Sequence, residues 1–114
     1  MKRPSVVVSG IGAVSAAGVG HSALVEALRS GRDCTTQVDS PLPISAVASV
    51  PCELPAYGDF PDDRKAWLAL MALDEAMADA GLVGELDPDR TAVFLGTGLS
   101  SVTPGELEED AYAH

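Results

Sequence analysis

Basic residues are scarce in this chain, which has 7 Lys and Arg against 17 Asp and Glu and a formal net charge of −10. A nucleic-acid-binding surface needs lysine and arginine to displace counterions from phosphates, so this composition argues against one. Docking on an anionic membrane surface is disfavoured for the same electrostatic reason. The apolar stretches are short and broken by glycine and proline, so none is expected to span a membrane. We therefore expect no nucleic-acid partner and no membrane partner.

Cysteine is also scarce. The chain has two, Cys34 and Cys52, with no Cys-x-x-Cys pair, and its histidines, His21 and His114, lie far from both in sequence. This spacing predicts no metal site. Two cysteines are too few for a disulfide scaffold, so we expect reduced thiols and a cytoplasmic location. Neither cysteine follows a strand or opens a helix, and each is interpreted as a small apolar residue rather than a nucleophile.

What the chain does contain is enough apolar residue to fold: 46% of its 114 residues are hydrophobic, which suits one ordinary domain. The runs at residues 5–9 and 91–95 predict two strands buried on both faces, because neither run alternates apolar with polar residues. Helical spacing of apolar residues predicts one helix from about residue 21 or 22 to residue 30 and a second from residue 62 or 63 to residue 80.

Both predicted helices have residues suited to their ends. Ser22 is expected to cap the start of the first helix, and Gly31 to end it in the left-handed conformation. Asp62 or Asp63 is expected to cap the second helix, which Gly81 ends.

The remaining segments are irregular. Residues 33–61 hold most of the eight prolines and predict a long loop, with a possible edge strand at residues 44–47. Strands separated by helices indicate a parallel sheet of the α/β class. Two short parallel strands cannot cover both their faces and both their edges. The pattern therefore predicts two parallel core strands with flanking helices in an incomplete domain.

The glycine turn at Gly10, Gly12 and Ser15 follows a predicted strand and invites a dinucleotide-binding interpretation, with Asp39 as a possible ribose ligand. Ser15 stands where the third glycine of that motif is expected, and no helix begins at once. A turn that lets two backbones pack closely is favoured over a dinucleotide site. The residues form no recognisable catalytic set, and no cofactor is expected.

Residues 6–18 read Val-Val-Val-Ser-Gly-Ile-Gly-Ala-Val-Ser-Ala-Ala-Gly and resemble the opening of the β-ketoacyl-acyl carrier protein synthases. The resemblance continues, in order and with compatible spacings, at residues 26–32, 63–64, 72–82 and 91–98. Residues 33–61 are short and divergent. Residues 1–114, with a proline-rich loop at about residues 33–61 outside the resemblance, are thereby identified as similar to the N-terminal part of the family's N-terminal domain.

The resemblance implies a partial thiolase-like fold and, for the full enzyme, a decarboxylative Claisen condensation of acyl and malonyl groups held by acyl carrier protein. It also implies a dimer. The family's cysteine nucleophile and two histidines come well after the position of Gly96-Thr97-Gly98, so no catalytic residue carries over and the chain is expected to be inactive alone. Leu99 matches an apolar position bordering the acyl-chain pocket of relatives. Gly10, Gly12, Gly96 and Gly98 are expected to be structural glycines.

Several alternatives stay open at this point. The pathway is fatty-acid or polyketide synthesis, and the subunit is either the condensing enzyme or a chain-length-factor-like subunit without the nucleophile. A hypothesis of another class is a non-catalytic interaction module whose partner supplies the missing strands. A dinucleotide-binding domain is a minor third hypothesis.

Overall fold

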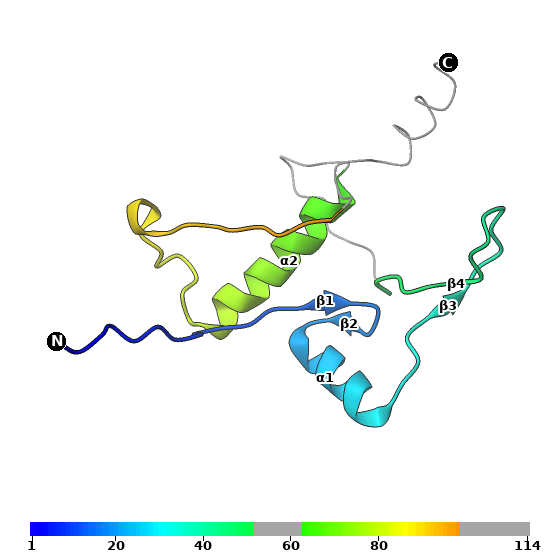
Figure 1. Cartoon of the computed structure of the whole chain (residues 1–114), viewed down its shortest axis with the longest axis horizontal. Coiled ribbons are helices and arrows are strands. Elements are labelled where there is room, and N and C mark those ends of the chain that lie inside the picture. The colour runs from blue at the N-terminus through cyan, green and yellow to red at the C-terminus, as the bar shows by residue number, and fades with distance from the viewer. Residues whose placement is uncertain (52–62, 99–114) are drawn as a thin grey trace, which may run out of the picture.

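The computed structural model describes residues 1–51 and 63–98, in which two helices, four short strands and one 3₁₀ turn are found (Figure 1). In chain order these elements are β1 (Val14–Ser15), β2 (Gly18–Val19), α1 (His21–Ser30), β3 (Thr36–Gln37), β4 (Ala46–Val47), α2 (Arg64–Asp79) and η1 (Pro88–Arg90). Neither of these described helices is long and apolar enough to cross a membrane.

Helix α1 follows directly from a small antiparallel hairpin. β1 and β2 pair with Val14 opposite Val19, and Gly18 makes the turn possible with a φ of 139°. The expected end of the helix is confirmed, since Gly31 is left-handed and Arg32 donates its backbone N–H to the carbonyl of Ala27. The expected cap is wrong: α1 begins one residue before Ser22, and its N-cap, Gly20, has no side chain to offer.

Helix α2 confirms the predicted second helix at both ends. The Asp63 carboxylate accepts the backbone N–H groups of Lys65 and Ala66, both at 3.0 Å, and so caps the first turn. At the other end Gly81 is left-handed and donates to Ala78, while Leu82 donates to Met77. These two bonds make a Schellman motif, which is why the helix stops where the glycine stands.

The proline-rich segment also contains a hairpin. β3 and β4 pair antiparallel, with Thr36 opposite Val47, so the possible strand at residues 44–47 is present over its second half. Cys52 and the rest of the loop to residue 62 lie outside the described residues, as do Leu99 and the acidic segment that follows it.

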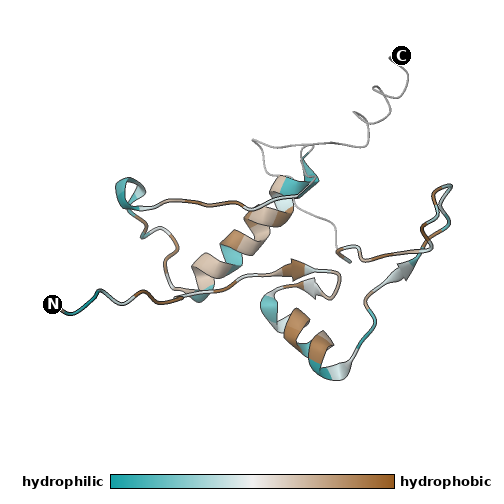
Figure 2. Cartoon of the chain, in the orientation of Figure 1, coloured by the Kyte–Doolittle hydropathy of each residue, from teal (hydrophilic) through white to brown (hydrophobic). Residues whose placement is uncertain are grey.

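The two runs expected to form core strands, residues 5–9 and 91–95, carry no strand hydrogen bonding within the described ranges. Figure 1 shows both as extended segments near α2, and Figure 2 shows apolar stretches along both. Gly10 lies against Ala80 while Gly12 lies against Ala72, and Phe94 lies near Leu73 while Thr97 lies near Asp63. Both segments therefore run toward the start of α2, which is the relative direction that parallel pairing requires. The pairing itself stays a prediction.

Little of this surface is covered. Among the described residues Ala27 alone is buried, at 6% exposed, and every position from Val6 to Val8 and from Val93 to Leu95 is largely exposed. Val6 is 96% exposed and Phe94 94%. Apolar residues in three consecutive positions are typical of a strand covered on both faces, so these segments lack the neighbours that their sequence suits.

The cap of α2 gives a direct test of this local structure. Asp63→Ala should destabilise the chain by about 1 kcal/mol, because two backbone N–H groups lose their acceptor. Asp63→Asn, which keeps a side-chain oxygen at the same place, is the matched control and should retain most of the stability. Urea unfolding followed by circular dichroism measures both variants, and equal midpoints for Ala and Asn would contradict the cap.

Candidate functional site

The glycine turn at residues 10–13 lies directly on α2, and its Gly10 and Gly12 have the least space around them of the described glycines. A methyl group added to Gly12 would overlap the carbonyl oxygen of Ala72 and lie 2.8 Å from the nitrogen of Ala76. One added to Gly10 would overlap the carbonyl oxygen of Ala76 and lie 2.8 Å from Cβ of Ala80. The alanine face of the helix and the missing side chains of the turn thus allow a backbone-to-backbone approach.

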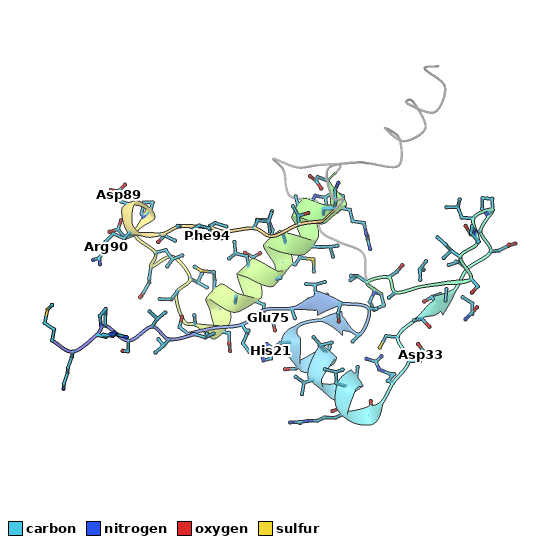
Figure 3. All side chains as sticks on the ribbon, in the orientation of Figure 1. His21, Asp33, Glu75, Asp89, Arg90 and Phe94 are labelled. Atoms are coloured by element: carbon cyan, nitrogen blue, oxygen red, sulfur yellow. The ribbon has the colours of Figure 1, made fainter. Side chains whose placement is uncertain are left out.

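The Glu75 carboxylate fixes this approach. It accepts the backbone N–H of Ala13 at 2.7 Å and that of His21 at 2.9 and 3.1 Å, one distance to each oxygen. Nδ1 of His21 lies 2.8 Å from Oε1 of the same carboxylate, and Figure 3 shows the two side chains next to each other. An ionised carboxylate only accepts hydrogen bonds, so Nδ1 of His21 carries the proton in this contact.

Asp79 repeats the arrangement one helical turn further along. Its Oδ2 accepts the backbone N–H of Ile11 at 3.0 Å. Residues four apart lie on one face of a helix, so Glu75 and Asp79 present two acceptors to alternate amides of the extended turn. The helix therefore binds the turn both by shape, through its alanines, and by two carboxylates.

The hydrogen bonds change the acidity of Glu75. The donated backbone N–H of Ala13 is the largest influence lowering the pKa of this carboxyl below its ordinary value of 4.5, and the backbone N–H of His21 is the next. Partial burial acts in the opposite direction and is outweighed. The charged carboxylate also lies at the positive end of α1, where an anion is favoured. Glu75 thus replaces the N-cap that α1 lacks in its own sequence.

A groove lies between α2 and the second extended segment. Its apolar end, a hollow of about 320 Å³, is lined by Ala66, Ala69, Leu70, Leu73 and residues 93–95. A second hollow of about 320 Å³ shares Ala66, Ala69 and Leu95 and adds the polar residues Asp63, Lys65 and Thr97. The groove therefore has an apolar end and a polar end, with Gly96 at the polar one.

These positions bear on the residues singled out from the sequence. The amides of Ile11 and Ala13, which a pyrophosphate would need, already donate to carboxylates, and the two negative charges would repel a phosphate. The glycine turn therefore disfavours dinucleotide binding. Gly96 and Gly98 have no atom within 4 Å of an added methyl group among the described residues, so their structural role stays a prediction. Leu99 lies outside the described residues.

The other candidates show no chemistry in the part of the chain that the structure describes. Cys34 is half-buried and free, and its thiol lies 3.6 Å from the carbonyl oxygen of Arg32. No group of three or more potential metal ligands occurs in this part of the chain. From the sequence, His21 was considered as a metal ligand, and Glu75 was missed. The available signal was two acids, four residues apart, on an otherwise alanine-rich helical face.

Comparison with known proteins shows a relationship to β-ketoacyl synthases. Specifically, the matched proteins are polyketide β-ketoacyl synthases of Streptomyces. The chain is 35% identical over 101 residues to the oxytetracycline polyketide putative β-ketoacyl synthase 1 of Streptomyces rimosus, covering 81% of this chain and 24% of that protein. A putative polyketide β-ketoacyl synthase 1 of Streptomyces cyaneus is 35% identical over 115 residues, covering 92% and 27%.

A third relative, the granaticin polyketide putative β-ketoacyl synthase 1 of Streptomyces violaceoruber, is 31% identical over 113 residues, covering 90% of this chain and 27% of that protein. No family model matches the chain, and no solved structure matches it significantly. The chain spans about a quarter of the length of the curated relatives it matches. The relationship to β-ketoacyl synthases that the residues predicted is therefore supported.

The close approach at the glycine turn can be tested with two glycine variants. Gly12→Ala should destabilise the chain by about 1–3 kcal/mol, because the new methyl group meets helix backbone, which cannot rotate away. Gly96→Ala enters open space and should change the stability by no more than about 0.5 kcal/mol. The urea unfolding midpoints of the two variants, compared with that of the parent chain, measure the two changes in stability. Equal effects at both positions would overturn the tight packing of the turn on α2.

Proposed function

We propose that this chain is the N-terminal part of a β-ketoacyl synthase that builds polyketides. The observation that carries the proposal is the match to polyketide β-ketoacyl synthases over 81–92% of this chain but only about a quarter of each relative. An ordered set of family motifs along the chain supports the same assignment. The proposed partners are acyl carrier protein and a second synthase subunit, and the proposed location is the cytoplasm.

The structure supports a scaffolding role for this part of the enzyme. Residues 10–12, which continue the segment 5–9, and residues 93–97 run along α2 in the same direction, and the two segments expose apolar side chains at consecutive positions. Such segments suit a sheet in a larger protein. Further strands of the same enzyme would pair with its edges, and other elements would cover its two faces. In this proposal the turn at residues 10–13 and the Glu75 carboxylate hold the first of these segments on its helix.

The proposed reaction forms a carbon–carbon bond between the carbonyl carbon of an enzyme-bound acyl thioester and C2 of a malonyl thioester. Cleavage of the bond between C2 and the malonyl carboxylate releases carbon dioxide and leaves the electron pair of that bond on C2. C2 uses this pair to attack the acyl carbonyl carbon, and the enzyme thiolate departs as the leaving group. Cys34 is not suited to that thiol role. Among the described residues its sulfur contacts the backbone carbonyl of Arg32, and the imidazole of His21, which could otherwise activate a thiol, is hydrogen-bonded to Glu75. The condensing residues belong to other parts of the proposed enzyme.

A second candidate function is a non-catalytic module that a partner polypeptide completes. The exposure of Val6–Val8 and Val93–Leu95 favours it, because the same apolar edges suit strands supplied by another chain. The two candidates differ in the size of the native polypeptide that contains this sequence.

The test uses the native polypeptide, captured with an antibody raised against residues 1–51. We expect a chain of roughly four times 11.7 kDa, since the sequence spans about a quarter of its relatives. With acyl- and malonyl-carrier protein it should release carbon dioxide and form a β-ketoacyl product, and iodoacetamide should abolish both.

The 114-residue polypeptide alone is the control and should give no product. The enzymatic proposal would be overturned if a native chain of full synthase size formed no condensation product, or if iodoacetamide left product formation unchanged. A native chain of 11.7 kDa bound to a second protein would instead support the module.

A further inference from the structure

One carboxylate closes the base of the β1–β2 hairpin. Ala13 immediately precedes β1, and His21 follows β2 and begins α1; both donate their backbone N–H groups to Glu75. Gly20 also donates to the carbonyl of Ala13 at 2.8 Å, so the two ends of the hairpin meet at this point. Glu75 thus binds the hairpin at its base, where the residues before β1 and after β2 meet.

The hairpin and α1 form one packed unit that lies beside α2. Helix α1 packs against β1 and β2, and α2 packs against β1. Figure 1 shows α1 beneath the hairpin and α2 on the hairpin's other side. The Glu75 carboxylate is therefore the polar link that joins the start of α1 to α2, and it lies across the hairpin base.

In the part of the chain that the structure describes, the charged groups near this link come from α1, from α2 and from Arg32, whose guanidinium donates to the carbonyl of Ala17 between β1 and β2. From α1 the facing group is His21, from α2 the neighbours are Asp74 and Asp79, and residues 10–20 of the turn and hairpin contain no titratable side chain. Asp79 is engaged by the amide of Ile11, four residues along the same face. The acceptor side of the link is thus acidic, and the donors are backbone amides together with one imidazole.

We propose that Glu75 is a proton-operated latch: while ionised it holds the hairpin and α1 on α2, and once protonated it releases them as a unit. A neutral carboxyl group has lost the charge that attracts the amides and the start of α1. Helix α2 keeps its own caps at Asp63 and Gly81 and stays helical. The proposal is independent of the condensing activity proposed above.

The direction of the pH effect follows from the acidity of the group. Because the pKa of Glu75 is lower in the folded chain than its ordinary value of 4.5, the stabilisation is fully present above that value. It is lost as the pH falls through the lowered pKa. The latch is therefore closed at neutral pH and opens in acid.

The test is a pH titration of the full chain from 7.5 to 3, with amide signals followed by nuclear magnetic resonance. The amide signals of Ala13 and His21 should shift together, with one shared midpoint below 4.5. Over the same range the amides of α1 should exchange with solvent at least about tenfold faster relative to those of α2, as expected for a lost charged hydrogen bond.

Two variants separate the latch from general acid unfolding. Glu75→Gln should show the fast α1 exchange already at pH 7.5. Asp63→Asn removes a carboxylate charge at the other end of α2 while keeping a side-chain oxygen for the helix cap, and should keep the latch and its midpoint. His21→Ala keeps the backbone donor and should open at higher pH than the parent chain.

The proposal would be overturned if α1 and α2 lost protection in one step, or if Glu75→Gln behaved like the parent chain. The absence of distinct, protected Ala13 and His21 amides at pH 7.5 would overturn it equally.

Discussion

The arrangement depends on the contact between α2 and the glycine turn, secured by the Glu75 carboxylate. Gly10 and Gly12 bring the backbone of the turn onto the alanine face of the helix, at a distance that no side chain would permit. Glu75 then accepts donors from Ala13 and His21, and so determines where the hairpin lies and where α1 begins. Hydrogen bonds to a charged acceptor are stronger than those between neutral groups, which suits a contact with few others around it.

The same contact accounts for the relation between this chain and its longer relatives. It orients the first extended segment on α2, and the second passes the same helix in the same direction. A pair of such segments presents apolar side chains and free backbone edges to further strands. The exposed valines near residue 7 and the exposed Phe94 are consistent with the proposed place of the chain in a larger condensing enzyme.

Local signals were sufficient to predict both helices. Asp63 and Gly81 bound α2, and Gly31 ends α1, because caps and left-handed glycines act within one turn of the helix. The start of α1 was wrongly assigned to a Ser22 cap, since the acceptor comes from a residue 54 positions away in the chain. The β1–β2 hairpin was missed for a related reason: strands of two residues are too short to show an alternating pattern.

The sequence alone determined the helices, the close approach of the glycine turn to another backbone, and the resemblance to condensing enzymes, because each depends on residues near one another in the chain. The tertiary structure decided which helix the turn meets, which carboxylate caps α1, and which way the two extended segments pass α2. The hydrogen bonds that join the turn and α1 to α2 connect residues 54 to 68 positions apart, and a pattern in a few neighbouring residues does not show which distant group will complete it.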